Sequence, residues 1–134
     1  MFTYVLDPAR ERVDVHVGGS TSGAEILTGL REVLDDPRFN PAHSVIIDLG
    51  KLEQTPTIAE LRDIALTVRA NSVGTGARRA MVTASPVFYE LARLFARLTA
   101  GSASRYRAFR TRDEAEAWLS GAHGSSDDDE RDAP

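Results

Sequence analysis

The chain of 134 residues contains no cysteine, so disulfide bonds and thiolate metal sites are excluded. It also lacks an apolar run of the ~20 residues that a helix needs to cross a bilayer, and we therefore expect no membrane span. The opening stretch MFTYVLDPARER has no basic segment followed by an apolar one, which is the pattern of a secretory signal. We accordingly expect a cytoplasmic protein.

Lysine is nearly absent, because Lys51 is the only lysine among 16 basic residues. The net charge of −4 is accounted for by residues 127–132, DDDERD, which carry five acids and one arginine. The rest of the chain is close to neutral, so nothing predicts a nucleic-acid partner. Residues 122–134 are polar and acidic with low complexity, and we expect them to form a disordered tail.

Histidine is scarce, and the three histidines are spread over the chain at positions 16, 43 and 123. No two of them stand at a metal-ligand spacing, so we expect no metal site and no cofactor. The G-x-S-x-G pattern of a nucleophile elbow is absent as well. The polar residues near the predicted strand ends include no predicted catalytic base. These residues are Asp48, Thr55, Thr57 and Ser85. We therefore expect a protein that is not an enzyme.

Apolar periodicity divides residues 1–121 into alternating strands and helices. Strict alternation, as in VDVHV at 13–17, predicts a half-buried strand, and continuous runs such as SVIIDLG at 44–50 predict strands covered on both faces. Apolar residues three and four apart predict helices. The expected strands are residues 2–6, 13–17, 44–50, 78–84 and 104–110, and the expected helices are residues 24–36, 57–71, 85–101 and 111–121.

This order, β-β-α-β-α-β-α-β-α, predicts a single α/β domain over residues 1–121. Strands that alternate with helices favour a mostly parallel central sheet with right-handed crossovers, and the first two strands favour an N-terminal β-hairpin. A glycine-rich turn is expected at residues 72–77. The loops that follow the parallel strands should gather at one edge of the sheet, where ligands and partners dock in open α/β folds.

Helix starts in this chain share a local pattern. The sequence TIAE at 57–60 fits the capping box S/T-x-x-E, in which the hydroxyl and the glutamate each satisfy a backbone amide. The same pattern occurs at residues 22–25 and 111–114, and Ser85-Pro86 combines a cap with a proline at the first helical position. Thr57 therefore has a sufficient structural role as a helix cap.

Two longer stretches, VDVHVGGSTSGAEILTGLREVL and VIIDLGKLEQTPTIAELRDI, resemble the STAS domain of anti-sigma-factor antagonists, within a divergent branch of bacterial STAS-like proteins. Asp48-Leu49-Gly50 resembles the end of the family's second core strand. The resemblance places Thr57 at the family's phosphorylated serine, although Pro56, Ile58 and Ala59 depart from the Asp-Ser-Ser-Gly motif. In that family a partner kinase, which is also the anti-sigma factor, modifies the serine.

The resemblance implies a regulatory protein-protein interaction module without enzymatic activity. Its expected partner is a kinase-like anti-sigma factor or another regulator, with Thr57 as the candidate phosphoacceptor. The candidate partner-binding residues are Asp48, Thr55, Thr57, Glu60 and Ser85.

An alternative is a carrier or sensor for a small apolar ligand or lipid. In this hypothesis Phe88, Leu94 and Phe95, from the apolar stripe of the helix at 85–101, line a pocket. The same stripe is what any helix needs to cover a sheet. A cavity beside these side chains would favour the ligand hypothesis, and a closed core would argue against it.

Overall fold

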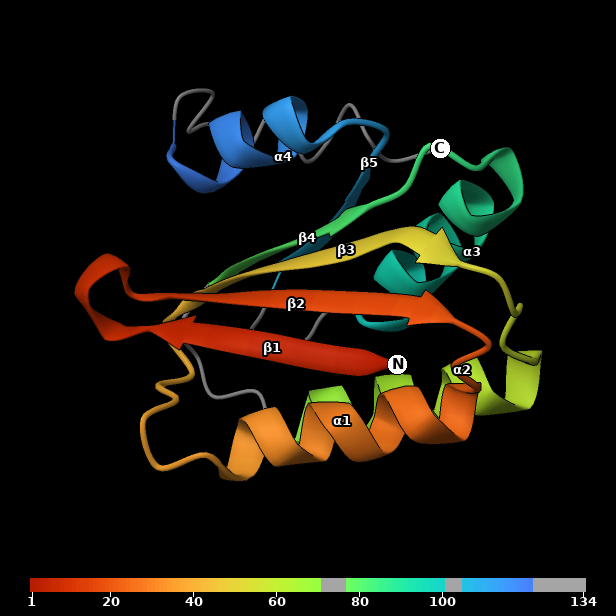
Figure 1. Cartoon of the computed structure of the whole chain (residues 1–134), viewed down its shortest axis with the longest axis horizontal. Helices are drawn as coiled ribbons and strands as arrows, with labels where there is room; N and C mark the ends of the chain where they lie inside the picture. Colours follow the sequence, from red (N-terminus) through yellow and green to blue (C-terminus); the bar gives the residue numbers. More distant parts are fainter. Residues whose placement is uncertain (71–76, 101–104, 122–134) are drawn as a thin grey trace.

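A five-stranded sheet forms the centre of the protein, with the strands in the spatial order β1-β2-β3-β4-β5 (Figure 1). The structure is a computed structural model and describes residues 1–70, 77–100 and 105–121. Most of the expected turn at 72–77 and the whole expected tail at 122–134 lie outside these residues. The elements are β1 (Phe2–Asp7), the 3-10 helix η1 (Pro8–Arg10), β2 (Arg12–Gly19), α1 (Gly23–Asp35), β3 (Ser44–Leu52), α2 (Ile58–Ala70), β4 (Arg78–Val82), α3 (Pro86–Leu98), β5 (Arg105–Phe109) and α4 (Arg112–Leu119).

The predicted hairpin and the predicted parallel sheet are both confirmed. β1 pairs antiparallel with β2, and β2 through β5 are parallel. The hairpin turn is a 3-10 helix that ends at Glu11, whose φ of 53° lies in the left-handed region. β3 runs two residues longer than predicted, because a register shift after His16 lets Gly18 and Gly19 pair with Lys51 and Leu52.

The first three helices cover one face of the sheet and α4 covers the other (Figure 1). From β2 to β5, each strand lies next to the preceding one, and the steps all run in the same direction across the sheet. Because crossovers between parallel strands are right-handed, steps in one direction place every crossover helix on the same face. The helix after β5 has no further strand to reach, and it folds onto the opposite face.

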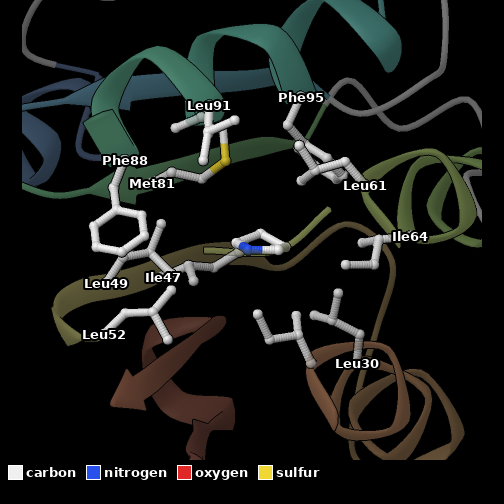
Figure 2. Close-up of a pocket in the computed structure, with 13 residues that line it drawn as sticks. Leu30, Ile47, Leu49, Leu52, Leu61, Ile64, Met81, Phe88, Leu91 and Phe95 are labelled. Carbon is white, nitrogen blue, oxygen red and sulfur yellow. The ribbon is translucent and has the colours of Figure 1, made fainter. Parts of the chain in front are cut away.

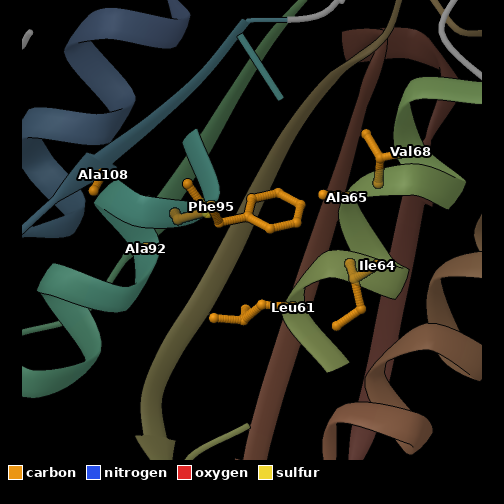
Figure 3. Close-up of a cluster of buried hydrophobic side chains, with 8 residues drawn as sticks. Leu61, Ile64, Ala65, Val68, Ala92, Phe95 and Ala108 are labelled. Atoms are coloured by element: carbon orange, nitrogen blue, oxygen red, sulfur yellow. The ribbon is translucent and has the colours of Figure 1, made fainter. Parts of the chain in front are cut away.

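Alternation along the strands separates the two faces. Val13, Val15 and Val17 point toward α1 and are at most 2% exposed. In β4, Met81 packs among α2 and α3, whereas Ala80 and Val82 pack under α4. Figure 3 shows how α2 and α3 close over the sheet, with the ring of Phe95 projecting between them.

Two residues that fit the apolar spacing of their helices lie outside the core. The side chains of Ile58 and Val87 are 49% and 61% exposed. Both lie in the first turn of a helix, at the edge of the sheet, where no further layer covers them. Helical spacing identifies the face of a residue but cannot tell where the covering layer ends.

Candidate functional site

Three helix starts meet at the edge formed by the carboxyl ends of the parallel strands. α1 follows β2, α2 follows β3 and α3 follows β4, and all three helices lie on the same face of the sheet (Figure 1). The first turns of these helices are therefore neighbours. We call this region the carboxyl rim and define it as residues 22–26, 56–61 and 85–88.

Thr57 caps α2 through the predicted capping box. Its Oγ1 accepts a hydrogen bond from the Glu60 amide at 3.1 Å, and Glu60 Oε1 accepts one from the Thr57 amide at 2.8 Å. The Thr57 carbonyl accepts the first helical hydrogen bond, from Leu61. Thr57 is nonetheless exposed, so its hydroxyl is accessible from solvent while it serves as a cap.

Glu60 also contacts a second helix. Its Oε2 accepts a hydrogen bond from the Ala24 amide, in the first turn of α1, at 3.2 Å. The hydrogen bond from the Thr57 amide is the main cause of a lowered pKa at Glu60, and the bonds from the Thr57 hydroxyl and the Ala24 amide lower it further. The carboxylate is therefore held in its charged form between two helix starts, which carry positive partial charge.

Ser85 is half-buried and serves the start of α3. Its Oγ accepts a hydrogen bond from the Phe88 amide at 3.4 Å, and its own amide donates to Thr83 Oγ1 at 3.2 Å. Thr55 is exposed and stands two residues before the cap of α2. The rim thus brings together Thr57, Glu60 and Ser85 as features of neighbouring helix starts.

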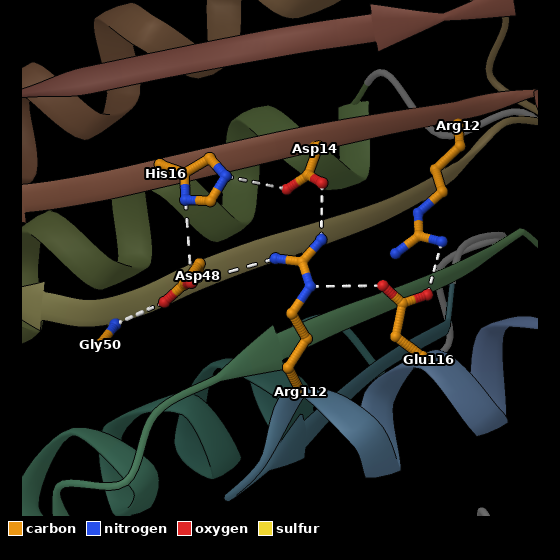
Figure 4. Close-up of polar contacts among 7 residues, drawn as sticks. All are labelled: Arg12, Asp14, His16, Asp48, Gly50, Arg112 and Glu116. Atoms are coloured by element: carbon orange, nitrogen blue, oxygen red, sulfur yellow. Dashed lines mark hydrogen bonds and ion pairs between the residues drawn. The ribbon is translucent and has the colours of Figure 1, made fainter.

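Asp48 lies apart from these residues, although it was predicted with them. Its side chain points to the face that carries α4 (Figure 4). There Oδ1 accepts a hydrogen bond from the Gly50 amide at 2.8 Å, and Oδ2 lies 3.7 Å from His16 Nδ1. The continuous apolar run of β3 gave no signal of which face this residue would take.

A charged network on the α4 face joins α4 to β2 (Figure 4). One nitrogen of Arg112 donates to Asp14 Oδ2 at 2.6 Å, and the pKa of Arg112 is raised mainly by this contact. Glu116 accepts from Arg112 at 3.3 Å and pairs with Arg12 at 2.6 Å. The contact with Arg12 is the main cause of the lowered pKa of Glu116.

Sequence reasoning missed this network because Asp14 and Arg112 are 98 positions apart. Two local signals were present: the polar positions of the alternating stretch VDVHV, and the i, i+4 spacing of Arg112 and Glu116. Neither signal identifies its partner in another element. The network fastens α4 to a strand that it does not otherwise cover.

No group of three or more metal-binding side chains is found within residues 1–70, 77–100 and 105–121. Asp14, His16 and Asp48 do lie together, but their contacts join them to one another and to Arg112. In the same stretches of the chain no helix is long and apolar enough to pass through a membrane.

An apolar cavity of about 80 Å³ lies behind the carboxyl rim, between the sheet and the three helices (Figure 2). All thirteen lining residues are apolar. Phe88 and Phe95 are among them, as the ligand hypothesis expected, and Leu94 is not. Pro56 and Leu61, which flank the capping box of α2, also line it.

The size of the cavity limits what it can hold. A dry apolar cavity of about 150 Å³ accepts benzene, and pockets for drug-sized ligands measure about 300–1,000 Å³. At 80 Å³ the cavity is smaller than either. A ligand with an acyl chain would require α1, α2 or α3 to move outward.

Comparisons with known proteins show the fold. No protein-family model matches the chain, and no curated protein matches it. Among solved structures, it is similar to an uncharacterized protein of the DUF3478 family from Shewanella loihica PV-4, described as having a SpoIIAA-like fold. The two share 15% sequence identity at a TM-score of 0.58, over 88% of this chain and 93% of the other. The resemblance to the STAS domain is thereby confirmed at the level of architecture: the chain has the SpoIIAA-like α/β fold.

Proposed function

We propose that the protein is a non-enzymatic regulatory module that binds a protein partner through the carboxyl rim, and that phosphorylation of Thr57 switches this binding. The proposed partner is a kinase-like regulator of the anti-sigma-factor type. The observation that carries the proposal is the exposed hydroxyl of Thr57 at a helix start. The SpoIIAA-like fold supports it by matching the resemblance in sequence.

Exposed apolar residues in the first turns of α2 and α3 support docking at the rim. Ile58 is 49% exposed and Val87 is 61% exposed. A single exposed apolar residue is common on a protein surface, but neighbouring ones favour an interaction site. Pro56, two residues before Ile58, and Phe88, directly after Val87, line the same cavity. Ile58 and Val87 therefore lie on the rim close in sequence to residues that line one cavity.

The electrostatics of the rim suit a binding switch. A phosphate at the start of a helix meets free backbone amides and the positive end of the helix dipole, so the modified chain keeps its fold. The modification adds close to two negative charges to the docking surface. A partner that contacts Ile58 and Val87 would meet those charges directly.

Tryptic mass spectrometry gives a direct test of the modification. Cleavage after Lys51 and Arg62 releases residues 52–62, LEQTPTIAELR, which contain Thr55 and Thr57. After incubation with ATP and an extract of the native cell, we expect phosphate on Thr57, assigned by fragmentation of this peptide. Thr57→Val should abolish the label, and the matched variant Thr55→Val should keep it.

A binding measurement tests the switch itself. We expect the native partner to bind Thr57→Val and the phosphomimetic Thr57→Glu with different affinities in titration calorimetry. Equal affinities would contradict the switch and leave the docking surface standing. Loss of binding in Ile58→Asp and Val87→Asp, with retained binding in Val5→Asp on an exposed position of β1, would support the rim as the docking surface.

The cavity favours a second candidate function, binding of a small apolar ligand. Because its lining is wholly apolar, the ligand would be a hydrocarbon chain or ring without a buried polar group. The neutral dye N-phenyl-1-naphthylamine tests this through its fluorescence. Because the dye is larger than the cavity, we expect weak binding that moves the helices outward. We expect still weaker binding in Ala92→Val, since Ala92 lines the cavity and is 4% exposed. Equal dye binding by both proteins would contradict a ligand site in the cavity.

A further inference from the structure

The two oxygens of the Glu60 carboxylate bind two different helices. Oε1 accepts from the Thr57 amide at 2.8 Å, and Oε2 accepts from the Ala24 amide at 3.2 Å. The first-turn amide of Ala24 has no acceptor within its own helix. This carboxylate therefore supplies the hydrogen bond that the position needs.

The corresponding glutamates of the other two capping sequences bond within their own helix. Glu25 accepts from the Ser22 amide at 3.1 Å, and Glu114 accepts from the Thr111 hydroxyl at 3.2 Å. Among the hydrogen bonds of the described residues, Glu60 alone of the three bridges two helices. The bridge is thus a property of this helix start and not of the capping box in general.

Gly23 brings the two helix starts into close contact. A methyl group in place of its hydrogen would lie 2.6 Å from the Cβ and the Cδ of Glu60. The side chain of Glu60 therefore lies directly across the backbone of α1, and no larger residue fits beneath it. The spacing between α1 and α2 at the rim is set by this contact together with the hydrogen bond to Ala24.

The same two helices form walls of the apolar cavity. Leu30 reaches it from α1, and Leu61 and Ile64 reach it from α2 (Figure 2). Ile26 of α1 lines it as well. Leu61 directly follows Glu60, and Ile26 stands two residues after Ala24. A change in the spacing of the helix starts therefore changes the width of the cavity at its nearest walls.

We infer that Glu60 is a latch between α1 and α2, and that a phosphate on Thr57 opens this latch and widens the apolar cavity. The inference rests on the proposed function, because it uses the same modification.

A phosphoryl group passes from a nucleoside triphosphate to Thr57 Oγ1. The Oγ1–P bond forms, the bond to the leaving diphosphate breaks, and the hydroxyl proton is released.

Charge repulsion opens the latch. Oγ1 lies 3.1 Å from the amide of Glu60, so the new dianion stands within the same helical turn as the Glu60 carboxylate. The Glu60 carboxylate accepts from the amides of Thr57 and Ala24. The phosphate carries more charge and three acceptor oxygens, so it competes with Glu60 for the amide of Thr57 and repels the Glu60 carboxylate. Glu60 turns away, the Ala24 amide meets water, and α1 is free to separate from α2.

Amide hydrogen exchange at Ala24, measured by NMR, tests the latch without a native kinase. Glu60→Ala should raise the exchange rate of this amide roughly 2- to 10-fold, the range for one hydrogen bond. The neighbouring amide of Glu25 serves as internal control, because Ser22 Oγ accepts its hydrogen bond. Gly23→Ala, which wedges the side chain of Glu60 away, should raise the Ala24 rate in the same way if Glu60→Ala folds poorly.

Three proteins then distinguish the latch from the switch. Phosphothreonine built into position 57 during translation should reproduce both the faster Ala24 exchange and the stronger binding of N-phenyl-1-naphthylamine expected for Glu60→Ala. The matched control Glu114→Ala, in the capping sequence of α4 on the other face, should change neither readout. If phosphothreonine leaves Ala24 exchange and dye binding at the unmodified level, the latch is overturned and the docking switch survives. If the latch opens but native extract never labels Thr57, the proposed switch fails and the latch stands.

Discussion

The two faces of the sheet use the same strands in opposite ways. On β2, Val13, Val15 and Val17 enter an apolar core under α1, while Arg12, Asp14 and His16 alternate with them on the other face. Three helices cover the first face, and a small apolar cavity lies between them and the sheet. Of the helices in the described residues, α4 alone covers the second face, and charged side chains complete the contact with β2. The face with more apolar cover holds the apolar cavity, and the face with less cover is held by charged contacts.

The largest expected effect lies on the α4 face, at Trp118. Its side chain is 2% exposed, and its ring lies 5.5 Å from that of Phe109. Trp118→Ala should lower the free energy of unfolding by about 3–5 kcal/mol, because it leaves a large cavity under α4. Urea unfolding followed by circular dichroism measures the change. Val87→Ala, at an exposed position, should stay within about 0.5 kcal/mol, and a similarly small loss at Trp118 would mean that α4 contributes little to stability.

The charged network on the same face should contribute less. Arg112→Met should cost about 1–2 kcal/mol, the range for charged hydrogen bonds reduced for a side chain that is 37% exposed. In a double-mutant cycle with Asp14→Asn, we expect a coupling that shrinks as salt rises to about 1 M, where the Debye length falls to about 3 Å. Additive effects of the two substitutions would show that the 2.6 Å contact does not stabilise the fold.

On the other face, Thr57→Val should cost about 1 kcal/mol through loss of the cap of α2. Thr55→Val is the matched control, because Thr55 is exposed and precedes the cap. Thermal unfolding of both variants measures the difference. If the two variants have the same stability, the capping box does not set the stability of α2.

The smallest expected effect is the loss of folding stability at acidic pH through Glu116 on one face and Glu60 on the other. The pKa of Glu116 is lowered by Arg12, and the pKa of Glu60 is lowered by the Thr57 amide. A carboxyl group with a lowered pKa adds stability above its unfolded value of about 4.3 and loses it as pH falls through the folded pKa. We expect Glu116→Gln to be less stable than the native chain near pH 7 and to lose less stability on acidification. Parallel pH profiles for both proteins would contradict this linkage.

Local pattern was sufficient to predict much of the architecture. The alternation in VDVHV, the continuous run in SVIIDLG and the capping sequences located the strands and the helix starts to within a few residues. These features depend on neighbours in sequence, so sequence carries them directly. The cap geometry of Thr57 was predicted on the same basis and is confirmed.

The candidate site was harder to predict because its contacts join distant segments. Glu60 reaches Ala24 over 36 positions, and Arg112 reaches Asp14 over 98. Asp48 was grouped with Thr57 because both lie near the predicted end of β3, yet the side chain of Asp48 takes the opposite face. These contacts depend on the strand order in the sheet and on the face that each helix covers. A local sequence pattern predicts neither of these.

The spatial order of the strands is also their order in the chain. Every neighbouring pair in the sheet is therefore joined by one turn or one crossover, and no strand waits for a partner from the far end of the sequence. Closing short loops costs less conformational entropy than closing long ones, and local pairing speeds folding. As the chain emerges during synthesis, each strand can pair with the one made just before it. A sheet of this kind can be built from its N-terminal end onward, one strand at a time.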